Sequence, residues 1–354
     1  MRVAVVGAGL AGSATAWRLA QRGAEVTLLE RASPANPQGS SHGSARIFRY
    51  AYADPFYARL VAQAREHWAE LEDATGETFF RCTGSLDFGA TRRPEQLAAV
   101  LTGIGVEHEL LSAASVSSRW PGIHTGGPAL WHPDAGVVDA AAAVLAMTDL
   151  ARKAGATVHE NWTVTAVEGS TVRSGDGRSV IADHVVLAAG GWLPELFPGL
   201  PQLRIRQEQA YHFPYREQGP DWPSFIHKGT GIQTYGLPGG RDAEHRGHKV
   251  AEYFGGHEIP TAAFNDGVID PANRRRIIAY VERHLPGLIP EPYAEATCVF
   301  TMTPTEDFVI DTRGPLTVAS PCSGHGAKFA PLLGAIIADS AMGLAEPAER
   351  FRLG

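Results

Sequence analysis

Residues 320–329, SPCSGHGAKF, bring a cysteine, a histidine and a lysine together with two glycines. These residue types could form a metal site, a nucleophile site or a loop that contacts a cofactor. Cys322 and His325 could supply half of a zinc site, but no second pair stands at ligand spacing and no HExxH pattern occurs. We therefore expect no metal, and we expect His325 to bond to backbone or to a cofactor.

Residues 39–43, GSSHG, fit the GxSxG pattern of serine hydrolases. A nucleophile elbow needs a strand before this pattern and a helix after it. Residues 33–38 contain two prolines, and residues 45–52 do not begin an obvious helix. The context therefore argues against a serine nucleophile.

The first dozen residues predict a strand, a glycine loop and a helix that could hold a dinucleotide. Residues 2–6 predict a short buried strand, and a helical pattern runs on to Leu19. Between them, Gly7 permits a tight turn, Gly9 lets the backbone approach a pyrophosphate, and Gly12 lets the helix pack close to the strand.

Residues 24–30 predict a second strand, which ends in Glu30 and is followed by Arg31. An acid about twenty residues after the glycine loop is placed to accept hydrogen bonds from a ribose. A lone GxGxxG is a weak signal, but this strand, helix and acid together predict a dinucleotide site.

Later segments indicate that the nucleotide-binding domain resumes after an insertion. Asp139 is the expected N-cap of a helix that runs to Lys153, and Gly155 ends that helix. Residues 156–167 predict further strand. A hairpin around residues 174–178 then precedes a strand at 184–192. This interrupted layout is more typical of FAD proteins than of simple NAD dehydrogenases.

Residues 320–329, called the histidine loop below because they contain His325, also fit this layout. Residues 316–320 predict a strand, SGHG a turn, and residues 329–342 an apolar helix. The loop amides and the helix N-terminus would then point at a bound anion, as a reduced flavin is. We expect Gly324, His325, Gly326 and Lys328 to contact the cofactor.

The chain resembles the FAD-dependent amine oxidases grouped with D-amino-acid oxidase, most closely the monomeric sarcosine oxidase and N-methyltryptophan oxidase branch. The similarity runs from Arg2 to the C-terminal helix. It is carried by GSSHGSARIFRYAY at 39–52, TCVFTMTPTEDFVID at 297–311, and SGHGAKF at 323–329.

This resemblance implies a flavin loop containing Ser41, His42 and Arg46, and covalent attachment of FAD through Cys298. Cys322 stays open as the other attachment site. A nearby positive charge would be needed to lower the cysteine pKa, and Arg46, Arg49 or His42 could provide it.

The resemblance also implies Lys249 near the flavin, a substrate-carboxylate pair of Arg46 and Lys328, and Tyr235 on the substrate side. Tyr253, Phe300 and Ala327 depart from the family pattern. The small side chain at position 327 leaves room, which favours a larger or cyclic secondary amino acid over sarcosine.

The implied reaction oxidises a secondary amine, or a cyclic or N-alkyl amino acid, to an imine while O2 becomes H2O2. Two alternatives remain: an FAD-dependent dehydrogenase that uses another electron acceptor, and a flavin-binding protein without turnover.

We expect an α/β fold with a Rossmann-like FAD-binding domain interleaved with a strand-rich, mixed-sheet substrate domain. The FAD-binding domain would comprise residues 1–78, 132–203 and 302–354, and the substrate domain residues 79–131 and 204–301. A helix from Asp54 supports the first boundary. Its apolar residues share one face at helical spacing, which marks core packing: Tyr57, Leu60, Val61, Ala64, Trp68 and Leu71.

The composition excludes several other classes of function. The 354 residues carry a net charge of -7, and no lysine or arginine block exceeds residues 274–276, so we expect no nucleic-acid partner. The N-terminal apolar run lacks a cleavage region or spanning length, which argues against export or a membrane. Three cysteines form no disulfide framework and suit a reducing compartment, so we expect a cytoplasmic protein. We also expect a monomer.

Overall fold

A six-stranded sheet, parallel except for one edge strand, forms one end of the molecule. The structure is a computed structural model and describes residues 1–200, 203–217 and 221–353; residues 201–202, 218–220 and 354, which fall within the expected domain ranges, lie outside the described residues. The strand order is β20-β21-β13-β1-β2-β9. The strands are β1 (Arg2–Val6), β2 (Glu25–Leu29), β9 (Thr157–His159), β13 (His184–Leu187), β20 (Val309–Arg313) and β21 (Leu316–Ser320).

Alternation along β1 explains why this sheet is covered on both faces. Val3 and Val5 pack into a core with the helices, while Ala4 and Val6 pack into a second core around Trp162. The helical face carries α1 (Leu10–Gln21), α2 (Pro55–Thr75), α5 (Ala140–Lys153) and α8 (Ala330–Ala341). The other face carries α6 (Leu193–Leu196) and a meander of β10 (Val164–Glu168), β11 (Thr171–Ser174) and β12 (Ser179–Ile181).

The expected local signals are confirmed here. Asp139 accepts a hydrogen bond from the Ala142 amide (2.9 Å) at the start of α5, and Asp54 accepts one from the Phe56 amide (2.9 Å) at the start of α2. The apolar stripe of α2 is buried. Two segments differ: residues 156–167 divide between β9 and β10 in different sheets, and β13 ends at Leu187, before a 3-10 turn at Gly190–Trp192.

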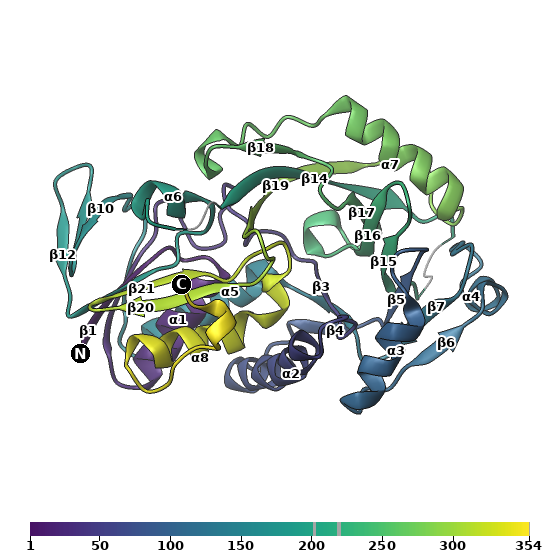
Figure 1. Cartoon of the computed structure of the whole chain (residues 1–354). Helices are drawn as coiled ribbons and strands as arrows, with labels where there is room; N and C mark the ends of the chain where they lie inside the picture. Colours follow the sequence, from purple (N-terminus) through teal and green to yellow (C-terminus); the bar gives the residue numbers. More distant parts are fainter. Residues whose placement is uncertain (201–202, 218–220, 354) are drawn as a thin grey trace.

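A second, mixed sheet extends from the middle of the molecule to its other end (Figure 1), in the order β18-β14-β17-β16-β15-β5-β7-β6, and β19 also pairs with β14. Its strands are β5 (Ser85–Phe88), β6 (Glu109–Leu111), β7 (Ala129–His132), β14 (Arg204–Pro214), β15 (Ser224–Lys228), β16 (Gln233–Pro238), β17 (Gly247–Glu252), β18 (His257–Ile259) and β19 (Ala294–Met302). The other helices are α3 (Pro94–Gly103), α4 (Ala113–Arg119) and α7 (Pro271–His284).

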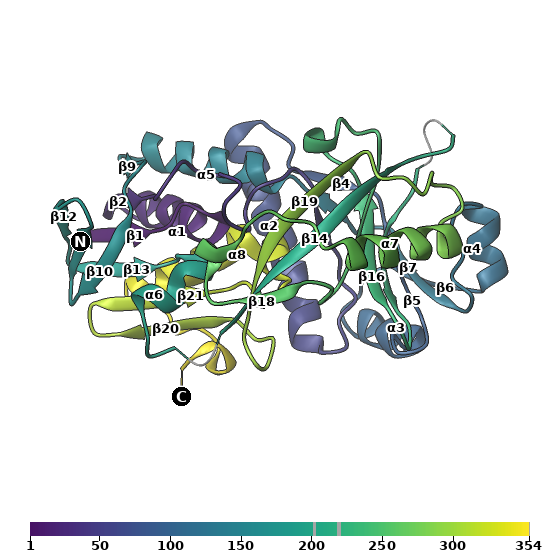
Figure 2. The ribbon, with the colours of Figure 1, turned by 90° about the horizontal axis from the view of Figure 1, so that it is seen from above.

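Figures 1 and 2 agree on the arrangement: the parallel sheet lies at one end, α3 and α4 lie at the other, and the long strands β14 and β19 run side by side between them. A small sheet of β3 (Arg46–Phe48), β8 (Gly136–Val138) and β4 (Phe80–Cys82) joins the two regions. The structure is thus the expected α/β fold, and the chain passes back and forth between the two sheets.

Candidate active site

A cavity of about 730 Å³ lies between the two sheets and is lined by residues of both. Nearly all of the residues that the sequence singled out lie on its wall: Gly7, Gly9, Glu30, Arg31, Ser41, Arg46, Tyr235, Lys249, Tyr253, Cys298, Gly324, His325, Gly326 and Lys328. Gly12 and His42 do not line it. A cavity of this size with convergent polar groups is the usual form of a cofactor and substrate site.

The glycine loop has the geometry that a pyrophosphate requires. Gly7 has a φ of +98°, and a Cβ there would lie 2.6 Å from the Ala188 carbonyl oxygen. A Cβ on Gly12 would lie 1.8 Å from the Gly7 carbonyl oxygen. The backbone can therefore turn tightly and helix α1 can begin against the loop only because these positions lack side chains.

Glu30 lies at the carboxyl end of β2 on the same wall of the cavity. Its carboxylate accepts hydrogen bonds from the amides of Ala8 (2.8 Å) and Ala32 (3.0 Å), which tie the glycine loop to this strand end. Arg31 stacks over the Trp192 ring at 4.5 Å. The Ser41 hydroxyl accepts from the Leu10 amide (3.0 Å) at the start of α1.

These observations test whether a dinucleotide cofactor fits. The loop leaves room where a Cβ would otherwise stand, helix α1 begins at the cavity, and Glu30 lies at the neighbouring strand end. The residues present therefore fit the adenosine and pyrophosphate part of FAD.

A second cluster lies where the flavin ring would be expected. Lys249 on β17 and Arg46 on β3 both act electrostatically on Cys298 of β19. Burial raises the pKa of the Cys298 thiol, and the two cations oppose that rise. Burial, followed by the charge of Arg46, lowers the pKa of Lys249 to about 8.

His42 does not supply the positive charge that the sequence allowed for. Burial, followed by Arg46 and Lys249, lowers the pKa of His42 to about 4, so its imidazole is neutral at pH 7. Its Nε2 is buried without a hydrogen-bond partner among the described residues. Lys249, which the family resemblance had placed near the flavin, is instead the positive charge that acts on Cys298 together with Arg46.

The histidine loop runs from β21 through a turn into the 3-10 helix η4 (Gly326–Phe329) and then into α8. The amides of His325 (3.0 Å) and Gly326 (2.8 Å) both donate to the Cys322 carbonyl. These two amides therefore close the turn, whereas the sequence had suggested that the loop amides would face a bound anion. The loop itself still lines the cavity.

The His325 ring bonds to backbone, as the sequence allowed. Its Nε2 lies 3.0 Å from the Glu306 carbonyl oxygen and its Nδ1 lies 3.0 Å from the Tyr52 hydroxyl. Burial lowers the pKa of His325 to about 3, so the ring stays neutral. Both ring nitrogens are engaged, which makes His325 a support for Tyr52.

Lys328 is a buried cation of this loop, and its ammonium donates to the Tyr52 hydroxyl (3.0 Å) and the His325 carbonyl (2.7 Å). Burial lowers its pKa well below the usual value, and Arg49 lowers it further. Trp68, from the stripe of α2, donates to the Lys328 carbonyl (2.7 Å) and fixes the backbone beneath it.

The cation beside Lys328 is Arg49, so the expected pairing of Arg46 with Lys328 needs correction. The Arg49 guanidinium lies 4.5 Å over the Tyr52 ring, the same residue whose hydroxyl Lys328 contacts. Arg46 instead donates to the carbonyls of Ser40 and His42 near Lys249. Arg46 is the first residue of β3 and Arg49 directly follows the last one, Phe48, so the two arginines lie at opposite ends of this strand.

The sequence reasoning also missed Tyr52 as a site residue. It lies under the two cations, and burial raises its pKa to about 12. The signal that could have found it is its place three residues beyond Arg49 in a stretch dense in arginine and tyrosine.

Two tyrosines complete the wall on the second sheet. Tyr235 lies on β16, and burial raises its pKa above the usual value. Tyr253 directly follows β17; its amide donates to the Gln233 carbonyl (2.8 Å), and burial raises its pKa too. Both hydroxyls are therefore neutral at pH 7 and can serve as hydrogen-bond donors.

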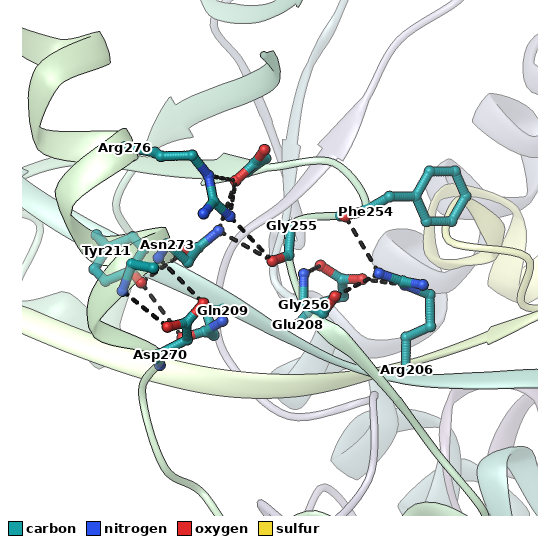
Figure 3. Close-up of polar contacts among 12 residues, drawn as sticks. Arg206, Glu208, Gln209, Tyr211, Phe254, Gly255, Gly256, Asp270, Asn273 and Arg276 are labelled. Atoms are coloured by element: carbon teal, nitrogen blue, oxygen red, sulfur yellow. Dashed lines mark hydrogen bonds and ion pairs between the residues drawn. The ribbon is translucent and has the colours of Figure 1, made fainter. Parts of the chain in front are cut away.

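The turn after Tyr253 is held by residues of β14 and α7 (Figure 3). Glu208 accepts from the Gly256 amide (2.9 Å), and Arg206 donates to the Phe254 carbonyl (3.2 Å). Asn273, near the start of α7, donates to the Gly255 carbonyl (3.3 Å). These bonds fix Phe254 at a φ of +60° and so fix the direction in which Tyr253 enters the cavity.

The described part of the chain carries neither a metal cluster nor a membrane span. Across residues 1–200, 203–217 and 221–353, no group of three or more histidine, cysteine, aspartate or glutamate side chains is arranged to hold a metal ion. Within the same ranges, no helix is both long and apolar enough to cross a bilayer.

Comparison with known proteins decides the family. Residues 2–340 match the DAO family, described as FAD dependent oxidoreductase. The chain belongs to the FAD-dependent oxidoreductase family. This confirms the enzyme class, the cofactor FAD and the D-amino-acid oxidase resemblance.

Curated relatives of this FAD-dependent oxidoreductase cover almost the whole chain. The human peroxisomal sarcosine oxidase is 33% identical over 96% of this chain and 92% of its own length. The monomeric sarcosine oxidase of Streptomyces avermitilis is 33% identical, with 96% and 93% covered. The N-methyl-L-tryptophan oxidase of Yersinia pestis is 31% identical, with 94% and 93% covered.

Solved structures share the fold. NikD, an unusual amino acid oxidase essential for nikkomycin biosynthesis, superposes with a TM-score of 0.89 at 26% identity, covering 99% of this chain and 96% of its own. The L-proline dehydrogenase of P. horikoshii superposes with a TM-score of 0.82 at 21% identity, covering 96% and 92%, and so agrees in fold.

Proposed function

We propose that this FAD-dependent oxidoreductase oxidises a secondary amino acid, N-alkyl or cyclic, to its imine, and passes the electrons to O2 to give H2O2. Water then hydrolyses the imine. The observation that carries this proposal is the meeting of Arg49 and Lys328 at Tyr52 inside the cavity. Relatives named for sarcosine and N-methyltryptophan, both N-methyl amino acids, support the substrate class.

The Arg49–Lys328 pair suits a carboxylate. A guanidinium can bind a carboxylate bidentately, and an ammonium adds a compact charge. The two cations lie near each other in a buried place, and Arg49 adds to the lowering of the Lys328 pKa, which an incoming anion would reverse. Binding of a substrate carboxylate would thus offset the cost of burying two neighbouring positive charges.

The same cations favour the reactive form of the substrate amine. Only the neutral amine has a free lone pair, and nearby positive charges lower the pKa of a bound ammonium by like-charge repulsion. Arg49 and Lys328 would repel the substrate ammonium from the carboxylate end of the substrate. Lys249 and Arg46 would repel it from the side of Cys298. Each pKa unit corresponds to about 1.4 kcal/mol.

FAD would be held by the glycine loop, Glu30 and Arg31 at one end and by the Lys249–Arg46–Cys298 cluster at the other. When bound, its flavin ring accepts the two electrons removed from the carbon–nitrogen bond. Cys298 is the proposed covalent attachment point, because Lys249 and Arg46 oppose the rise that burial imposes on its pKa. Lys249 is proposed to stabilise the small anion that forms as O2 is reduced.

The cavity wall favours a substrate larger than sarcosine. Tyr253 and Phe300 lie with ring centroids 6.3 Å apart, and Ala327 lines the cavity with a methyl group alone. The two rings contact each other and form one aromatic wall, and the small side chain at position 327 elsewhere on the lining leaves room for a ring or a long side chain. A larger or cyclic secondary amino acid therefore fits better than an N-methylglycine.

The carboxylate contact is tested with Lys328→Met. A charged hydrogen bond contributes about 1.5–3 kcal/mol, so loss of the ammonium should weaken binding of simple carboxylate inhibitors roughly tenfold to a hundredfold. Binding is measured by titrating the flavin absorbance of the holoenzyme. The matched control is Lys153→Met, an exposed lysine at the end of α5. Unchanged carboxylate affinity in Lys328→Met would assign the lysine a structural part only.

A further inference from the structure

A second pair of cations, Arg92 and Lys228, lines the same cavity beyond Arg49. Arg49 and Arg92 both donate to the Ala51 carbonyl, Arg92 from its Nη2 at 2.7 Å, so the two guanidinium groups lie next to each other. Charges therefore continue from Lys328 through Arg49 to Arg92. Nothing in the reaction proposed above uses this extension.

Lys228 is tied to the loop that carries Arg92. It is the last residue of β15, and its carbonyl accepts from the Thr91 amide (3.0 Å) and the Thr91 hydroxyl (2.9 Å). Gly89 has a φ of +107°, and a Cβ there would lie 2.5 Å from the Lys228 carbonyl oxygen. The loop can lie this close to β15 only with glycine at position 89. The backbone contacts of the loop therefore hold Arg92 and Lys228 on the same part of the cavity wall.

Arg92 and Lys228 differ in whether an acid pairs with their positive charge. Asp87, fully buried behind the loop, accepts from the Arg92 Nε (2.6 Å) and balances that guanidinium. The Lys228 ammonium has no hydrogen bond or ion pair within the described ranges, and its aromatic neighbour is Tyr253, at 5.5 Å from the ring centroid. Burial lowers the pKa of Lys228, and the charges of Arg92 and Arg49 lower it further.

Two acids act on Lys228 electrostatically, the exposed Glu306 and the buried Asp87, but neither forms an ion pair with it within the described ranges. A substrate carboxylate on Arg49 and Lys328 would leave the Lys228 ammonium unmatched. A half-buried charge without a partner is costly, and a second anion would remove that cost.

We propose that Lys228, with Arg92 beside it, binds a second carboxylate on the side chain of the substrate, so that the preferred substrates are secondary amino acids with two carboxylates. This inference rests on the proposed function for the position of the first carboxylate. The side chain would extend from the Arg49–Lys328 pair past Tyr253 to the end of β15.

Binding of non-oxidisable acids to the holoenzyme tests this subsite. The probes are malonate, succinate, glutarate and adipate, each compared with its own monoamide, which keeps the shape and removes one charge. For at least one chain length, the diacid should bind about tenfold or more tightly than its monoamide, since a charged hydrogen bond is lost with the second carboxylate. The best length reports the spacing of the two subsites. Equal affinity of diacid and monoamide at every length would overturn the proposal.

Variants separate the two ends. Lys228→Met should remove the preference for the diacid and leave monoamide affinity unchanged, Lys228→Arg should restore the preference, and Lys153→Met should change nothing. Lys328→Met should weaken diacid and monoamide alike. A diacid preference that survives in Lys228→Met would contradict the assignment of the subsite to this lysine.

Turnover distinguishes failure of the subsite from failure of the proposed function. N-methylglutamate and N-methylglutamine differ only in the charge of the side chain. If both reduce the flavin with equal kcat/KM, the second subsite is wrong and the oxidase proposal stands. If diacids bind as expected but no secondary amino acid reduces the flavin, the subsite is supported and the proposed reaction is wrong.

Discussion

Lys249 lies in a half-buried cluster with Arg46 and Cys298, where desolvation lowers its pKa to about 8. Its ammonium is therefore present below that pH and is lost as the pH rises through it. Because the small anion derived from O2 forms only in the oxidative half-reaction, reoxidation of the flavin should slow above about pH 8, while reduction by substrate should not follow this titration.

Lys249→Met should make flavin reoxidation slow at every pH and remove the transition near pH 8. Stopped-flow spectroscopy of the two half-reactions measures this directly. Equal slowing of both half-reactions would place Lys249 in substrate binding instead.

Cys298 is the second residue whose role is testable alone. The denatured protein should keep its yellow colour, Cys298→Ser should release the flavin on denaturation, and Cys322→Ser should not, because Lys249 and Arg46 act on the thiol of Cys298. Absorbance of the acid-precipitated pellet reads out attachment. The reverse pattern would move the linkage to Cys322, and release from the unmutated protein would remove covalency.

Single residues also show which parts of the site could be predicted from the sequence. The positions of Gly7, Gly9 and Glu30 on the cavity wall were predictable, since they follow from local spacing in one strand, loop and helix. Arg49 was missed as the partner of Lys328 because residues 45–52 were not identified as containing a strand, and without β3 the different positions of Arg46 and Arg49 could not be inferred. The residue types were visible, but the face on which each lies was not.

At the scale of elements, α1 depends on its contact with the glycine loop. Gly12→Ala would place a Cβ 1.8 Å from the Gly7 carbonyl oxygen, a backbone atom that cannot move aside cheaply. The free energy of unfolding should fall by about 1–3 kcal/mol, as in other overpacked sites, and FAD content should drop. Denaturant unfolding and the flavin-to-protein absorbance ratio measure the two effects.

The matched control is Gly103→Ala at the end of α3, where a Cβ would meet nothing within 4 Å. That variant should stay within about 0.5 kcal/mol of the parent protein. Equal behaviour of the two variants would contradict the role of Gly12 as a close-packing position.

Other elements show where sequence reasoning ends. The predicted strand β1 and the capped helices α2 and α5 agree with the structure, because caps and apolar periodicity are local signals. Residues 156–167 were expected to add strand to one domain, yet they divide between two sheets. Sheet membership depends on partners distant in the chain, and no local pattern records it.

At the scale of the whole molecule, the site is assembled by long-range pairing. Strands β5 and β15 pair in parallel, with Ser85 opposite Ser224, and this pairing brings Arg92 to Lys228. We propose that residues 1–78, 132–203 and 302–354 form the FAD-binding domain, which also contributes Arg49 and Lys328, and that residues 79–131 and 204–301 form the substrate domain, which also contributes Cys298. The sequence carried no signal for these contacts, because they join strands that are distant in the chain.

The central claim is that one cavity holds FAD beside a carboxylate site for a secondary amino acid. Anaerobic mixing of the holoenzyme with a panel of N-alkyl and cyclic amino acids, their esters, and amines without a carboxylate tests it most directly. We predict that the free amino acids bleach the flavin absorbance and that the esters and simple amines do so far more slowly. Bleaching by simple amines as fast as by amino acids, or no bleaching by any secondary amine, would contradict the account.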